Sequence, residues 1–184
     1  MKYFHLTAIV LALFVTCKFV CPAPVRAASA AEINHDAESA LAKLYAKSAA
    51  AEALGEKAKG VLVFPSIVKG GFIVGGQYGE GALFQGEKTM GYYSTVQGSF
   101  GLQAGLQKFG YALFFMTDSV MNWFLKSEGW ELGVGPTIVV VDIGAAKSLS
   151  TTTLQSEIYA FFFDQKGLMG GLGLQGTKVT KIEK

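Results

Sequence analysis

The chain has 184 residues, 51% of them hydrophobic, and its 16 basic and 14 acidic side chains give a formal net charge of +2. Three of the basic residues precede position 31, so the remaining 154 residues carry 13 lysines, no arginine and 14 acids, a net charge of −1. Without arginine or a net positive field, this part of the chain is not expected to bind nucleic acid.

Residues 1–30 have the features of an export signal. Lys2 supplies a positive charge, residues 7–17 form an apolar core, and small residues allow cleavage after Ala27 or after Ala30. The apolar run is too short to span a membrane permanently. The sequence therefore predicts a signal peptide over 1–30 and a single exported domain over 31–184, located in the periplasm or at the envelope.

Both cysteines, Cys17 and Cys21, lie within the predicted signal, so the exported domain has no thiol and no disulfide. A cysteine that follows an export signal can be lipidated and would then anchor the domain to a membrane. Thr16 and Val20 stand where such sites prefer a small residue, so the lipoprotein form is disfavoured.

Residues 31–59 have the composition of a helix, rich in alanine, glutamate and lysine. Their apolar side chains recur near the 3.6-residue period and form one stripe: Ile33, Ala37, Ala40, Leu41, Leu44, Tyr45, Ala51 and Leu54. Asn34 or Asp36 is expected to cap the start, and Gly55 to end the regular part. We expect the helix to pack on a sheet. The alternative, a helix on a membrane surface, is disfavoured by its mixed charge.

The composition changes at Gly60, with 22 glycines in the 117 residues from there to Gly176. Runs with strand character, separated by turn-forming residues, are residues 61–64, 71–78, 92–107, 111–117, 131–141, 157–164 and 168–176. Their close spacing favours antiparallel pairing, and residues 165–167 are interpreted as a tight hairpin connection. The run over 92–107 is too long for a flat strand, so its glycines are expected to curve it.

One short helix is predicted after Asp118, which is expected to cap it, with Gly129 as its stop. Its large apolar side chains are expected to fill the core of the sheet. The predicted fold class is α+β: an N-terminal helix over 31–59 packed on a glycine-rich, strongly curved, antiparallel and barrel-like sheet over 60–180, with one short mid-chain helix.

The run from Val96 to Gln107 alternates with a period of two. Its even positions are Val96, Gly98, Phe100, Leu102, Ala104 and Leu106, and its odd positions are Gln97, Ser99, Gly101, Gln103, Gly105 and Gln107. Such a strand has one apolar face and one polar or bare face.

Residues suited to catalysis or metal binding are scarce. The predicted domain has one histidine, His35, and no cysteine, so neither a metal site nor a cofactor is expected. The G-x-G-x-x-G match at 171–176 has no room for a following helix before Lys184, and the phosphate-loop-like run at 81–89 has Glu87 inserted in it. No nucleophile and base can be paired, so the chain is not expected to be an enzyme.

Aromatic residues are numerous and often consecutive, as in residues 161–163. Consecutive residues of a strand point to opposite faces. Either helices cover the sheet on both faces, or an apolar patch meets a lipid or a partner; we favour coverage.

Several blocks of the sequence resemble the SYLF domain family. They are GVLVFP at 60–65, KGGF at 69–72, GSFGLQAG at 98–105, GVGP at 133–136, and EIYAF at 157–161 followed by KGLMGG at 166–171. Their order and spacing agree with the family over about residues 36–177. The resemblance implies a lipid-binding module: eukaryotic members bind phosphoinositide membranes, and yeast members also bind actin.

We therefore expect a non-enzymatic domain that binds phospholipid at an envelope membrane surface. The lysines expected to meet lipid headgroups are Lys43, Lys47, Lys57, Lys59 and Lys69. Two alternatives stay open: a structural or protein-interaction domain with a protein partner in the envelope, and, less favoured, a small outer-membrane barrel.

Overall fold

The computed structural model describes residues 27–127, 129–141, 156–167 and 176–184. Most of the predicted signal peptide, with Cys17 and Cys21, lies outside these residues, as do most of the predicted strand over 168–176 and of the G-x-G-x-x-G match. Within the described residues, three helices and six strands form an α+β fold with a strongly curved sheet, which confirms the predicted class.

The N-terminal helix consists of two pieces, α2 (Ala30–Lys47) and α3 (Ala49–Gly55), which are separated at Ser48. Gly55 ends the second piece, as predicted. The cap of α2 is Ser29, so the prediction of Asn34 or Asp36 was wrong: both lie inside the helix. Ser29 forms a capping box with Glu32, which satisfies two backbone N–H groups that the helix leaves free.

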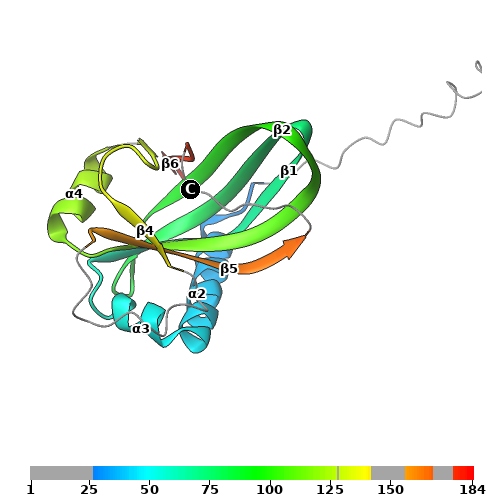
Figure 1. Cartoon of the computed structure of the whole chain (residues 1–184). Coiled ribbons are helices and arrows are strands. Elements are labelled where there is room, and N and C mark those ends of the chain that lie inside the picture. Colours follow the sequence, from blue (N-terminus) through cyan, green and yellow to red (C-terminus); the bar gives the residue numbers. More distant parts are fainter. Residues whose placement is uncertain (1–26, 128, 142–155, 168–175) are drawn as a thin grey trace, which may run out of the picture.

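Most of the sheet is one long hairpin of β1 (Gly60–Gln85) and β2 (Lys88–Phe115). Runs that the sequence divides into four strands are continuous here, and the register extends from the Gly60–Phe115 pair to the Gln85–Lys88 pair. Figure 1 shows the two strands curving together, away from α2 and α4. The prediction that the run over 92–107 belongs to a curved strand is confirmed.

The hairpin bends so far that the two arms of β1 approach each other. A Cβ placed on Gly79 would lie 2.7 Å from Cγ1 of Ile67, and one on Gly81 would collide with the carbonyl oxygen of Val63. Only glycine allows this close approach of backbones. The glycines therefore determine how tightly the sheet can curl.

Four shorter strands complete the sheet on either side of β2. The first arm of β2 pairs with β6 (Lys178–Ile182), and β6 pairs with β3 (Gly129–Glu131). The last residues of β2 pair with β5 (Ile158–Gly167). On β5 lies β4 (Ile138–Val141), in parallel. The sheet is therefore mixed, and the all-antiparallel prediction was wrong at this pair; the 16 residues between β4 and β5 suffice for the crossover that parallel pairing requires.

Two further predictions need correction. Residues 165–167 lie within β5 and are not a tight turn. The mid-chain helix α4 (Asp118–Lys126) is capped by Thr117, whose Oγ1 accepts from the backbone N–H of Val120, and Asp118 is its first residue.

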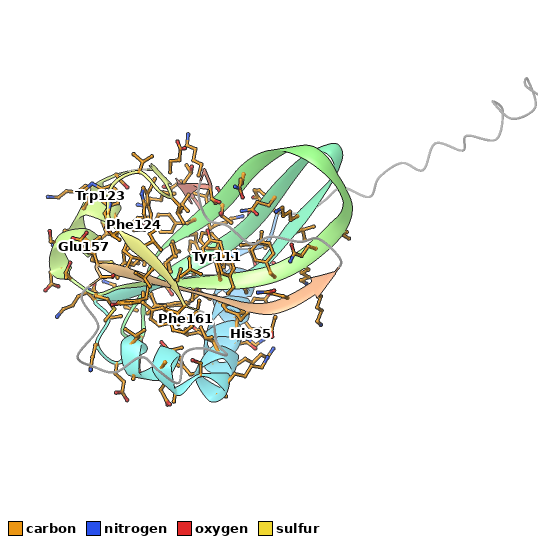
Figure 2. All side chains as sticks on the ribbon, in the orientation of Figure 1. His35, Tyr111, Trp123, Phe124, Glu157 and Phe161 are labelled. Carbon is orange, nitrogen blue, oxygen red and sulfur yellow. The ribbon has the colours of Figure 1, made fainter. Side chains whose placement is uncertain are left out.

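Helices cover part of each face of the sheet, so the coverage that we favoured holds for the aromatic run at 161–163 but not for the whole sheet. Phe161 and Phe163 pack with α2 and α3, whereas Phe162 belongs to the opposite core, which contains Tyr111 and, from α4, Phe124 (Figure 2). Three consecutive aromatic rings are thus buried on alternating faces. We refer below to the side of α2 and α3 as the helix side and to the side of α4 as the inner side.

Candidate functional site

At the bend of the hairpin, the sheet extends beyond α2. The polarity of its two faces there is the reverse of that in an ordinary half-buried strand. Leu106 is 67% exposed, whereas its neighbour Gln107 is 5% exposed. On the other arm of β2, Val96 is 47% exposed and its neighbour Thr95 is completely buried. Because neighbouring side chains of a strand point to opposite faces, apolar groups here face outward and polar groups face inward.

The buried side of the bend is polar and almost fully hydrogen-bonded. The hydroxyls of Thr95 and Tyr111 lie 2.9 Å apart, and Nε2 of Gln77 donates to Oγ1 of Thr177 at 3.4 Å. Burial raises the pKa of Tyr111, so this hydroxyl stays neutral. Oε1 of Gln107 is buried without a hydrogen-bond partner, which costs about 1–3 kcal/mol for such a group.

The outward side carries four exposed apolar side chains, two on each arm of the hairpin. Tyr78 and Val96 are register partners, 53% and 47% exposed. Val68, 48% exposed, lines the same groove as Tyr78. Leu106 lies opposite Gly70, two residues beyond Val68 on the same strand face. We call these four the apolar strip: Val68, Tyr78, Val96 and Leu106.

Lysines stand at both ends of the apolar strip. In the register, Val68 is followed by Lys108 on β2 and Lys166 on β5, both exposed. At the other end Val96 is followed by the exposed Lys178, whose own partner on β3 is Glu131. Two register rows, one on each arm of the hairpin, therefore run from an apolar side chain of the strip to lysine: Val68–Lys108–Lys166 and Tyr78–Val96–Lys178.

The β5 end of this row meets the C-terminal part of α2. Lys47 Nζ donates to Oδ1 of Asp164 at 2.8 Å. This hydrogen bond and the charges of Lys47, Lys43 and Lys166 hold the pKa of Asp164 below its usual value. We call Lys43, Lys47, Lys108 and Lys166 the basic cluster. Three of these lysines act on the carboxylate of Asp164, and Lys108 is the register partner of Lys166, so positive charges gather at this corner.

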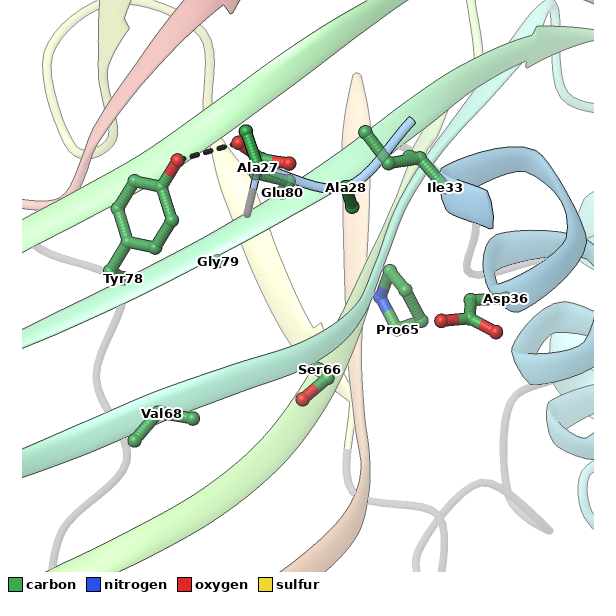
Figure 3. Close-up of a pocket in the computed structure, with 10 residues that line it drawn as sticks. All are labelled: Ala27, Ala28, Ile33, Asp36, Pro65, Ser66, Val68, Tyr78, Gly79 and Glu80. Atoms are coloured by element: carbon green, nitrogen blue, oxygen red, sulfur yellow. Dashed lines mark hydrogen bonds between the residues drawn. The ribbon is translucent and has the colours of Figure 1, made fainter. Parts of the chain in front are cut away.

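A groove of about 450 Å³ runs between α2 and the two arms of β1, and Val68 and Tyr78 form part of its wall (Figure 3). The Tyr78 hydroxyl donates to Oε1 of Glu80 at 2.7 Å, and Nζ of Lys184 lies 3.0 Å from Oε2 of the same carboxylate. Partial burial, the hydrogen bond to Glu80 and the charge of Glu80 raise the pKa of Tyr78 to about 12. The hydroxyl is therefore neutral at physiological pH.

The five lysines predicted from the sequence do not form one surface. Lys43 and Lys47 belong to the basic cluster. Lys57 and Lys59 follow α3, where Nζ of Lys59 lies 3.7 Å from Oδ2 of Asp118. Lys69 is half-buried and its register partner is Gln107, so by alternation it lies on the inner side. The sequence-based prediction did not include Lys108, Lys166 or the apolar strip. The alternation over 96–107 was a signal for two members of the strip, Val96 and Leu106.

Features of catalytic and metal sites are scarce in this part of the molecule. His35 is exposed on α2, and the described residues hold no group of three side chains that could bind a metal. The phosphate-loop-like run at 81–89 lies in the β1–β2 hairpin, so the helix that such a loop requires does not follow it. Within the described ranges, no helix is both long and apolar enough to cross a membrane.

The family model described as Ysc84, Las17-binding protein actin regulator, matches residues 96–184. Residues 96–184 belong to the SYLF (Ysc84) family. No curated protein sequence matches the chain. The SYLF match begins at Val96 of the apolar strip and includes Leu106, Lys108 and Lys166. The family is one of binding domains, in line with a site that is a surface rather than a catalytic centre. The resemblance of residues 60–72, on β1, lies outside the matched range and stays a prediction.

Proposed function

We infer that the protein is a non-enzymatic binding domain that attaches to phospholipid at a membrane surface of the envelope. The contact would be made by the apolar strip, with the basic cluster beside it. The observation that carries this proposal is the inverted hairpin, in which Leu106 and Val96 are exposed while Gln107 and Thr95 are buried. Exposed apolar side chains that gather on one face of a protein mark surfaces that meet another apolar phase.

The magnitudes fit reversible attachment. Transfer of a Leu or Val side chain from water is worth about 1.5–3 kcal/mol when burial is complete. The side chains of the strip are about half-exposed, so each has roughly half of that value to gain at a membrane. Each lysine near an anionic surface adds about 1 kcal/mol, a contribution that salt weakens. Four apolar side chains and four lysines together are sufficient for measurable, salt-sensitive binding.

Co-sedimentation with vesicles tests the proposal. The purified exported protein is mixed with phosphatidylcholine vesicles and with vesicles that also contain phosphatidylglycerol, at low and high salt. We expect it to pellet with the anionic vesicles and less so at high salt. Protein that stays in the supernatant with both vesicle types would contradict lipid binding.

The family description favours one second candidate. It names a protein, Las17, as the partner of family members, so the apolar strip could instead meet a protein of the envelope. That function predicts no vesicle binding and a reproducible cross-linked species in which the partner is joined to residues beside Leu106.

A further inference from the structure

The residues just before α2 are part of the fold. The Oγ atom of Ser29 accepts from the backbone N–H of Glu32 at 3.3 Å, and Oε2 of Glu32 accepts from the backbone N–H of Ser29 at 2.7 Å. The carbonyl of Ser29 accepts the first helical bond, from Ile33, at 3.0 Å. The carbonyl of Ala28 accepts from Nζ of Lys184 at 3.0 Å.

This last contact joins Ala28, before α2, to Lys184, after β6, and through Lys184 to the β1–β2 hairpin. Lys184 Nζ also lies 3.0 and 3.1 Å from the two carboxylate oxygens of Glu80. The two side chains are only 10% and 15% exposed, so solvent screens this ion pair less than a surface pair. Ala28 is thus held by a largely buried ion pair, which makes it an integral residue of the domain.

The two cleavage sites allowed by the sequence leave different products. Cleavage after Ala30 removes the cap of α2, its capping box and the carbonyl acceptor of Lys184. Cleavage after Ala27 keeps all three. Both bonds follow an alanine, with Val25 two positions before it at one site and Ala28 at the other. The small-residue rule admits both sites, and we distinguish them by their products.

We propose that the mature protein begins at Ala28. A leader endopeptidase hydrolyses the Ala27–Ala28 peptide bond: the hydroxyl of a water molecule goes to the carbonyl carbon of Ala27, and the nitrogen of Ala28 leaves as an amine that takes up protons. Ala28 lines the groove together with Asp36 and Glu80 (Figure 3). The new ammonium group therefore forms at a groove whose lining includes these two carboxylates.

The test uses the full chain, exported with its own leader from a bacterial host and recovered for intact mass measurement and N-terminal sequencing. We expect the sequence Ala-Ser-Ala-Ala-Glu. A start at Ala31, a lipidated start at Cys17 or Cys21, or a chain that keeps its leader would each overturn the proposal.

Two matched variants sharpen this test. Ala27→Leu is expected to abolish the Ala28 start, because leucine is too large before the scissile bond. Ala30→Leu changes the first residue of α2 in the same way and is expected to leave the Ala28 start unchanged. Normal processing of the Ala27→Leu chain, or loss of processing in the Ala30→Leu chain, would assign cleavage to the other site.

Discussion

Leu106 and Gln107 are neighbours on β2, and the apolar one is 67% exposed while the polar one is 5% exposed, with its Oε1 unpaired. In a soluble strand the opposite arrangement has the lower free energy, because it buries apolar area and solvates the amide. The inverted arrangement is understandable if the outward face of the hairpin meets an apolar phase.

Replacing the buried amide tests the inner side of this relationship. Gln107→Met has a similar length and removes the unpaired oxygen, so we expect the free energy of unfolding to stay the same or to rise by about 1 kcal/mol. The matched control is Thr95→Val, which leaves the buried Tyr111 hydroxyl without its partner and is expected to cost about 1–3 kcal/mol. Urea denaturation measures both. If the Gln107→Met protein is less stable than the Thr95→Val protein, Oε1 of Gln107 is not an unpaired buried group.

Removing the exposed apolar groups tests the outer side. Leu106→Ser and Val68→Ser are each expected to weaken binding to anionic vesicles about fivefold, since about 1 kcal/mol of transfer free energy is lost. Thermal stability should change little, because both side chains are exposed. Val140→Ser is the control: Val140 is 54% exposed but lies on β4, away from the strip. Equal loss of binding in all three variants would disprove a localised contact.

The basic cluster is tested by charge reversal. Lys108→Glu with Lys166→Glu is expected to reduce binding to anionic vesicles about tenfold or more and to flatten its salt dependence, with no effect on neutral vesicles. Lys57→Glu with Lys126→Glu reverses the same number of charges elsewhere and should leave binding nearly unchanged. If this control pair weakens binding equally, net charge rather than the cluster attracts the protein.

The ion pair between Glu80 and Lys184 is expected to contribute to stability. Glu80→Gln leaves a largely buried ammonium without its carboxylate, and we expect a loss of about 1–3 kcal/mol. Asp118→Asn is the comparison, because its pair with Lys59 is long and solvent-exposed and should cost about 0.5 kcal/mol or less. Thermal denaturation distinguishes them. Equal melting temperatures for the two variants would mean that Lys184 is not held as described.

Stability should fall at alkaline pH. Burial and the charge of Glu52 raise the pKa of Tyr45 from 10.0 to about 12, and burial also raises the pKa of Tyr111. A raised pKa favours the neutral hydroxyl in the folded state, so its contribution is complete below pH 10 and is lost as the pH rises toward 12. Chemical denaturation at several pH values should show this decline, and Tyr45→Phe should lessen it. A decline of the same size in the Tyr45→Phe protein would rule out a part for Tyr45.

The local features of the sequence determined the helices and the class of the fold. The apolar stripe of residues 31–59 is buried as its period requires, with Ile33, Leu44 and Leu54 each at most 3% exposed. The cap at Ser29 was also readable, since Ser29 and Glu32 have the spacing of a capping box. Such features depend on residues a few positions apart, so the sequence alone contains them.

Long-range pairing decided the rest. The alternation over 96–107 is the same whichever way the strand faces, because a turn about its axis exchanges the two faces without changing the sequence. Only the pairing of β2 with β1, β5 and β6 directed Gln107 inward and Leu106 outward. The same pairing placed Lys108 and Lys166 side by side, although 57 residues separate them in the sequence. The sequence by itself determined that residues 96–107 of β2 have an apolar face, and the tertiary structure decided that Val96 and Leu106 of this face are exposed.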